Sequence, residues 1–224
     1  NFKRSAFSSI TSQEKFDIVI VGGGIAGVST LYFLLKNTHK TVALLEKNHI
    51  ASGATGHNAG FVVNYMEKVT QELIKQFGFE KTQKGFKELD SSWELLYELL
   101  DSIGSRDQLV PLKGGVLGYT SVNWLFKAVE EEIADEKIGR GAWRYFLSDT
   151  VITDSEIPLH VRPYISIVPS EKILEILQIK DSGYVGAATP YNPRIHKGRM
   201  NSSALCYKML LYLEQKYSER FTVF

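Results

Sequence analysis

Residues 16–27 read FDIVIVGGGIAG, and this stretch decides the fold. It opens with six mostly apolar residues of the kind that form buried strands. The glycines Gly22, Gly24 and Gly27 then give the spacing GxGxxG, and residues 25–36 have the length and apolar content of a helix. A strand, a glycine turn and a helix in this order predict the first half of a βαβ nucleotide-binding unit.

Each glycine has a mechanical reason to be present. Gly22 lets the chain leave the strand in a tight turn, and Gly24 lets the backbone approach a pyrophosphate without a side chain in the way. Gly27 lets the helix lie close against the sheet. The phosphates of a ligand would then lie at the N-terminus of the helix, where free N–H groups and the helix dipole favour anions.

Glu46 completes the unit. It follows the apolar strand expected at residues 41–45 and lies 19 positions after Gly27. A carboxylate at this point accepts hydrogen bonds from a ribose 2′-hydroxyl and argues against a 2′-phosphate, hence against NADP. The alternatives are a strand-to-helix junction without a ligand and a solvated acid at the end of a strand. The agreement of strand, helix and acid favours a dinucleotide.

A second segment, ASGATGHNAG at residues 51–60, leads into the apolar run FVV. Small and hydroxyl-bearing residues allow backbone N–H groups to approach a pyrophosphate or the edge of an isoalloxazine ring. An ordinary loop is the alternative, and composition alone leaves it open.

Over residues 16–63 the sequence resembles the FAD-dependent D-amino acid oxidase family, which includes glycine oxidase, sarcosine oxidase and dimethylglycine dehydrogenase relatives. The resemblance implies an α/β fold, with a Rossmann-like FAD/NAD(P)-binding domain and a partial antiparallel β-rich substrate domain. It implies FAD as the cofactor, with no metal. The residues implied to bind FAD are Gly22, Gly23, Gly24, Ile25, Ala26, Gly27, Glu46, Lys47, Ser52, Gly53, Ala54, Thr55, His57, Asn58, Ala59 and Gly60.

His57 allows a sharper hypothesis. In the dimethylglycine and sarcosine dehydrogenase branch of the resembled family, a histidine in a comparable segment is bonded covalently to the flavin. This chain departs from that branch because Gly56 stands where tryptophan is usual. We therefore expect a non-covalent flavin or phosphate contact, with covalent attachment and a histidine that contacts only water as the alternatives.

The resemblance implies hydride transfer to flavin from a carbon that bears an amine, so the expected enzyme oxidises the C–N bond of an amino acid or secondary amine. One alternative is a flavin-dependent 2-hydroxy acid or glycerol phosphate dehydrogenase, and another is a non-catalytic nucleotide-binding module or inactive fragment. A substrate carboxylate requires a cation. The candidates by sequence position are Arg162, Arg194 and Arg199, but arginine is typical of the surface, so no catalytic role is assigned to them. The resemblance places the catalytic residues beyond Phe224 and leaves the electron acceptor open.

Three parts of the chain are expected. Residues 1–104 form the βαβ unit and following helices, residues 105–197 a partial substrate domain, and residues 198–224 a return to the FAD-binding domain. In the returning part, a turn at 198–202 is expected to lead into a helix at 204–216 that Ser202 or Ser203 caps, followed by a strand at 221–224.

The middle of the chain is predicted from its patterns alone. Apolar spacing indicates helices at residues 67–77, 86–103 and 124–137, strands within 108–120 around a turn at 113–115, and an antiparallel lid or sheet at 143–190. Phe86 and Trp93 are expected in a core, and Gly104 is expected to end the second helix. The acidic run at residues 130–132 is expected on a solvated face.

Composition sets the remaining expectations. The 224 residues are 44% apolar with a net charge of +1, which gives no electrostatic argument for nucleic acid or membrane partners. No apolar stretch approaches the roughly 20 residues of a membrane span. Residues 1–10 lack the apolar core of a secretory signal. A single cysteine, Cys206, fits a reducing compartment and a packing role, so we expect a cytoplasmic protein. The small-molecule amine or amino acid substrate is what the resemblance implies.

Overall fold

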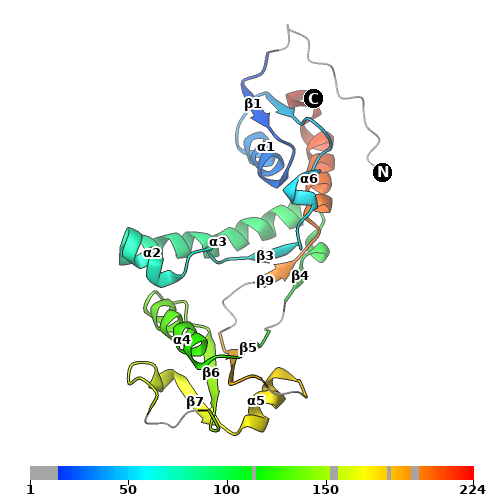
Figure 1. The fold of residues 1–224 in the computed structure, drawn as a ribbon. Helices are drawn as coiled ribbons and strands as arrows, with labels where there is room; N and C mark the ends of the chain where they lie inside the picture. Colours follow the sequence, from blue (N-terminus) through cyan, green and yellow to red (C-terminus); the bar gives the residue numbers. More distant parts are fainter. Residues whose placement is uncertain (1–14, 113–114, 152–155, 181–182, 193–196) are drawn as a thin grey trace. The chain divides into compact units, whose positions relative to one another are not determined.

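The computed structural model describes residues 15–112, 115–151, 156–180, 183–192 and 197–224 (Figure 1). The chain forms two compact units. The first comprises Asn1–Val62, Leu95–Val110 and Gly198–Phe224, and the second comprises Val63–Glu94 and Pro111–Lys197. The arm at 1–10, the turn at 113–114 and Arg194 lie outside the described residues. The assignment of residues 1–104 and 198–224 to cofactor binding and of 105–197 to substrate binding stays a prediction.

The first unit is built on a parallel three-stranded sheet in the order β1-β2-β10. Its strands are β1 (Ile18–Val21), β2 (Val42–Leu45) and β10 (Phe221–Val223). Helix α1 (Ile25–Asn37) connects the first two strands. The predicted βαβ unit and the final strand are therefore confirmed, and so is the α/β class.

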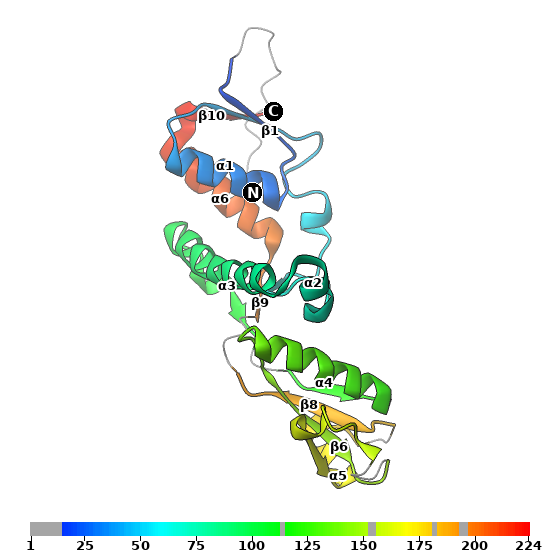
Figure 2. The same cartoon turned by 90° about the vertical axis from the view of Figure 1, so that its left-hand side faces the viewer.

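Helices α1 and α6 (Ser202–Tyr217) lie side by side in both views (Figure 2). Leu31 and Leu35 of α1 and Met209 and Leu213 of α6 are fully buried. Cys206 is also fully buried, and burial raises the pKa of its thiol to about 11. The cysteine is thus a packing residue, as expected.

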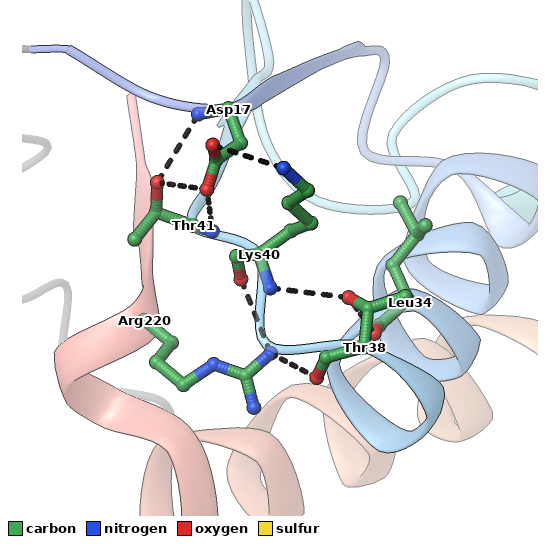
Figure 3. A network of polar contacts seen from close by, with 6 residues as sticks. All are labelled: Asp17, Leu34, Thr38, Lys40, Thr41 and Arg220. Carbon is green, nitrogen blue, oxygen red and sulfur yellow. Dashed lines mark hydrogen bonds and ion pairs between the residues drawn. The ribbon is translucent and has the colours of Figure 1, made fainter.

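A polar network closes the amino-terminal end of this sheet (Figure 3). The carboxylate of Asp17 accepts the backbone N–H of Thr41 at 2.8 Å and lies 3.4 Å from the ammonium of Lys40. Arg220 donates to the carbonyls of Thr38 at 2.6 Å and Lys40 at 3.1 Å. The segment before β10 is thereby fastened to the loop between α1 and β2.

The start of α6 differs from the prediction. Asn201, rather than Ser202 or Ser203, caps the helix, because its side-chain oxygen accepts the N–H of Ala204 at 2.9 Å. The predicted turn at 198–202 is partly extended, since β9 (Lys197–Arg199) occupies its first half. The Ser202 hydroxyl is used elsewhere, as described below.

The central helices begin at other residues than expected. Helix α2 (Thr70–Phe77) and helix α3 (Phe79–Ser102) are separated by Gly78, whose φ of 84° suits glycine. Gly104 ends α3 as predicted. Its φ is 61°, its N–H donates to the Asp101 carbonyl at 3.2 Å, and the next N–H donates to the Leu100 carbonyl at 2.8 Å, which is a Schellman motif.

The second unit contains a four-stranded sheet in the order β5-β8-β6-β7. Its strands are β5 (Leu117–Tyr119), β6 (Trp143–Ser148), β7 (Ile165–Val168) and β8 (Gly186–Pro190). β8 is antiparallel to β5 and β6, but β6 and β7 are parallel, so the expectation of an antiparallel sheet was wrong for this pair.

Helix α4 (Val122–Lys137) packs its residues Leu125 and Val129 against Leu147 of β6, and helix α5 (Ser170–Leu177) packs against β6 and β8. Phe86 and Trp93 are buried, which confirms the prediction for both aromatic residues.

The acidic run at 130–132 is not a solvated face. Glu132 is only 2% exposed, and its Oε1 accepts the N–H groups of Ala142 at 2.6 Å and Trp143 at 3.0 Å. Glu131 accepts the N–H groups of Thr70 and Gln71 at the start of α2. The residues that follow α4 turn back toward the helix, and this tertiary contact buries the carboxylate of Glu132. The local sequence pattern alone predicts a solvated side chain there.

A further sheet has three short strands in the order β3-β9-β4, with β3 at Phe61–Val63 and β4 at Val110–Pro111. Among the described residues, no helix has the length and apolar character that crossing a membrane requires, and no group of His, Cys, Asp and Glu has the arrangement of a metal site.

Candidate active site

The glycine turn lies at the carboxyl end of β1. Gly22 has a φ of +103°, which other residues rarely adopt, and its N–H donates to the Leu45 carbonyl at 2.7 Å. A Cβ on Gly27 would overlap the carbonyl oxygen of Gly22. The turn therefore requires glycine at both ends, which brings the start of α1 to the edge of the sheet.

The N-terminus of α1 is capped from a distant part of the chain. Its N-cap residue, Gly24, has no side chain, and the N–H of Ile25 instead donates to Oγ1 of Thr55 at 3.0 Å. A Cβ on Gly24 would lie 3.0 Å from the same oxygen. The two predicted cofactor-binding segments thus meet at a helix N-terminus, where the dipole favours an anion.

Glu46 is held beside the turn by two backbone bonds. Its Oε2 accepts the N–H of Gly23 and its Oε1 accepts the N–H of Asn48, both at 2.8 Å. These bonds, first that from Gly23, lower the pKa of the Glu46 carboxyl below its ordinary value. Each oxygen keeps a second lone pair, so the ionised carboxylate can still accept ribose hydroxyls.

The second segment forms the short helix η1 (Ala54–Gly56) and then turns at His57. The imidazole is exposed, and its Nδ1 lies 2.9 Å from the Gly53 carbonyl. A carbonyl only accepts hydrogen bonds, so this contact requires a proton on Nδ1. In the neutral ring, Nε2 is then the nitrogen with a free lone pair.

Asn58 joins this segment to α6. Its amide donates to the carbonyl of Thr55 at 2.7 Å and to the hydroxyl of Ser202 at 2.9 Å, while its oxygen accepts the N–H of Gly60 at 2.7 Å. The Ser202 hydroxyl donates in turn to the Thr55 carbonyl at 2.6 Å. Gly60 has a φ of +72° and accepts the N–H of Met200 at 2.9 Å.

A cavity of about 380 Å³ opens between these elements. Among the described residues that line it, Arg199 is the one with a charged side chain. The lining residues are Thr55, Gly56, Asn58, Ala59, Gly60, Gln108, Val110, Arg199, Met200, Asn201, Ser202 and Ser203.

The predicted cofactor-binding residues lie in two neighbouring places, the cavity and the glycine turn. Thr55, Asn58 and Gly60 line the cavity, and Gly24, Ile25 and Glu46 form the neighbouring turn. Of the candidate cations, Arg199 lines the cavity and Arg162 lies in the second unit.

Several lining residues were missed by the sequence prediction. Gln108 and Val110 carry no local signal of a site. Asn201, Ser202 and Ser203 lie in the turn that the prediction marked as returning to the cofactor domain, which was the available signal.

The residues present fit a flavin dinucleotide on the geometry of this chain. A helix N-terminus without a side chain on its N-cap suits a diphosphate, and an ionised Glu46 suits a ribose that carries free hydroxyls. The neighbouring cavity is lined largely by glycines and by hydroxyl and amide side chains, which can donate hydrogen bonds to a ligand and accept them from it.

Comparisons with known proteins agree with this geometry. A family model described as FAD dependent oxidoreductase matches residues 17–173. The chain is 47% identical over 53 residues to sarcosine oxidase subunit beta of Rhizobium meliloti, covering 23% of this chain and 13% of that protein. It is 36% identical over 70 residues to mitochondrial dimethylglycine dehydrogenase of Homo sapiens, covering 29% and 8%.

The fold is similar to that of L-amino acid deaminase from Proteus myxofaciens, solved in complex with anthranilate. The TM-score is 0.55 at 18% identity, and the match covers 99% of this chain and 41% of that one. At this identity the likeness concerns the fold. The chain spans less than half the length of each of these proteins.

Proposed function

The chain belongs to the FAD dependent oxidoreductase family, and on this premise we propose that its first unit holds FAD in an enzyme that oxidises the C–N bond of an amino acid or secondary amine. FAD is the cofactor of this family. The observation that carries the proposal is the contact between Thr55 and Ile25, because it joins the two predicted cofactor-binding segments at the N-terminus of α1.

Each group of residues has a proposed role. The backbone of the turn and of the first turn of α1 holds the diphosphate, and the carboxylate of Glu46 accepts the ribose hydroxyls. The second segment supplies small residues and N–H groups along the remainder of the cofactor. The proposed contacts are Gly22, Gly23, Gly24, Ile25, Ala26, Gly27, Glu46, Lys47, Ser52, Gly53, Ala54, Thr55, His57, Asn58, Ala59 and Gly60.

When bound, the flavin supplies hydride acceptance from the carbon that bears the amine. The residues of this chain bind the cofactor and orient it relative to the substrate. Of the candidate arginines that the structure describes, Arg199 lines the cavity, which supports it as the cation for an anionic group of the substrate or cofactor.

His57 is proposed to contact the flavin or a phosphate without a covalent bond. Its exposed ring and the free Nε2 lone pair support a contact with a ligand, while Gly56 departs from the tryptophan of the covalent branch. Acid precipitation of the intact holoprotein tests this. Yellow colour in the supernatant is expected, and yellow colour in the washed pellet would show covalent attachment instead.

The proposal is tested by the visible absorption of the purified intact protein and by anaerobic addition of substrates. Bleaching by sarcosine, dimethylglycine, glycine or proline is the expected result. Bleaching by lactate or glycerol 3-phosphate alone would favour oxidation of a hydroxyl-bearing substrate. Purified protein that does not bind FAD would reject the proposal, and stable FAD binding without bleaching by either group would favour a non-catalytic module.

A further inference from the structure

We propose that Ser202 is a positioning residue, whose hydroxyl holds Thr55 and Asn58 in the geometry that receives FAD. The inference rests on the proposed function, since it concerns how the FAD-binding segment is held. Ser202 belongs to α6, 144 positions after Asn58 in the sequence.

The hydroxyl of Ser202 has three close partners, and the most distant of them is Oδ1 of Asn58 at 3.2 Å. Its single proton is directed to the nearer acceptor, which leaves two bonds with defined directions. It donates to the Thr55 carbonyl at 2.6 Å, and it accepts from Nδ2 of Asn58 at 2.9 Å. The same Nδ2 donates to the Thr55 carbonyl at 2.7 Å. The three groups therefore form a closed triangle, which fixes both the backbone of Thr55 and the side chain of Asn58.

Thr55 transmits this position to the helix that faces the diphosphate. Its carbonyl is bound by the triangle, and its hydroxyl accepts the N–H of Ile25 at 3.0 Å. One residue thus connects the first turn of α6 to the first turn of α1. Preorganised groups bind a ligand more tightly because less ordering remains to be done on binding.

Ser202 is free for this role because it does not cap its own helix. The side chain of Asn201 accepts the N–H of Ala204 at 2.9 Å, and the carbonyl of Asn201 accepts the N–H of Leu205 at 3.0 Å. Loss of the Ser202 hydroxyl should leave α6 intact. The effect of a variant on FAD can therefore be separated from an effect on the helix.

The experiment compares the intact protein with S202A, S202T and T38A. Thr38 donates to the Leu34 carbonyl at 2.7 Å at the opposite end of α1, so T38A destabilises the same unit without touching the second segment. FAD dissociation constants are measured by flavin fluorescence well below the melting temperature, and hydrogen exchange is measured with and without FAD.

We expect S202A to raise the FAD dissociation constant about tenfold, through the loss of two hydrogen bonds in a partly buried place. Exchange should accelerate at residues 54–60 while Ala204 and Leu205 stay protected. S202T should restore both values, and T38A should leave the dissociation constant unchanged. Wild-type affinity in S202A, or a tenfold loss in T38A as well, would overturn the inference. A wild-type protein that does not bind FAD would instead reject the proposed function.

Discussion

Oγ1 of Thr55 accepts the N–H of Ile25 at 3.0 Å, so a residue 30 positions away supplies the side-chain cap that Gly24 cannot give to α1. A helix start without its own capping side chain leaves N–H groups for a ligand. The N-terminus of α1 thus combines a glycine at its N-cap position with a hydroxyl that comes from residues 51–60.

Two substitutions of Thr55 should distinguish the effect of its hydroxyl, which caps α1, from the effect of the size of its side chain. T55V keeps the shape of the side chain but removes the oxygen that accepts from Ile25, so we expect FAD to bind about fivefold more weakly, as a lost hydrogen bond of about 1 kcal/mol predicts. T55S keeps the oxygen and should bind within about twofold of the wild type. Titration with FAD followed by fluorescence measures both. Equal affinity of T55V and T55S would contradict the capping role.

A side chain at position 24 should leave the stability of the fold nearly unchanged but should weaken the binding of FAD. The Cβ of G24A would lie 3.0 Å from Oγ1 of Thr55, at the start of the helix that we propose faces the diphosphate of FAD. We expect FAD affinity to fall at least about tenfold while the melting temperature changes little. G115A is a matched control, because a Cβ at Gly115 meets no atom within 4 Å. An unchanged FAD affinity in G24A would argue against the diphosphate position.

The first βαβ unit could be predicted because its signals are local. The glycine spacing, the apolar strands and Glu46 lie within one short stretch, and the structure gives each its expected element. The resemblance to the D-amino acid oxidase family is confirmed by the family match. The end of α3 at Gly104 was predictable for the same reason, since the Schellman motif is a property of consecutive residues.

The remainder depends on residues that are distant in the sequence. Ser202 or Ser203 was predicted to cap α6 because serine favours that position. In the structure Asn201 is the cap, and the Ser202 hydroxyl accepts a hydrogen bond from Asn58. Glu132 was predicted to be solvated because it belongs to a run of three acidic residues. In the structure its carboxylate accepts the N–H groups of Ala142 and Trp143. No local pattern identifies such partners.

Arg220 should stabilise the first unit through three carbonyl oxygens at and beyond the end of α1. Figure 3 shows its contacts with Thr38 and Lys40, and it also donates to the carbonyl of Leu35 at 3.2 Å. We expect R220A to lose about 2 kcal/mol of unfolding free energy, because these partly buried acceptors lose a charged donor. R220K keeps the charge near the helix C-terminus but lacks the planar fork, so its loss should be about 1 kcal/mol.

Hydrogen exchange of the α1 amides measures this loss in the first unit. K208A is the control, since Lys208 is an exposed cation on α6. If R220A and K208A showed the same protection as the wild type, the network in Figure 3 would have no part in the stability of the unit.

Glu132 should make the stability of the second unit depend on pH. Burial raises the pKa of its carboxyl above the ordinary 4.5, and the nearby charges of Asp135 and Glu136 act in the same direction, against the N–H bonds from Trp143 and Ala142. The folded state therefore binds the proton more tightly than the unfolded state. Stability should be greatest below about pH 4.5 and should fall as the pH rises through the raised pKa.

Two substitutions separate the charge of Glu132 from its hydrogen bonds. E132Q keeps an oxygen for the two N–H groups without the buried charge, so it should lose most of this pH dependence and gain about 1 kcal/mol at neutral pH. A residual slope should remain, because burial also raises the pKa of Asp135. E132A leaves both N–H groups unpaired and should lose about 2 kcal/mol at all pH values.

Tryptophan fluorescence during urea unfolding reports on this unit, since Trp93, Trp124 and Trp143 all lie in it. E94Q serves as the control because Glu94 is an exposed acid of the same unit. A pH profile of E132Q that matches the wild type would assign the pH dependence to other carboxyls. If E132Q were as unstable as E132A at neutral pH, the ionised carboxylate would be the stabilising form and the direction of the argument would be reversed.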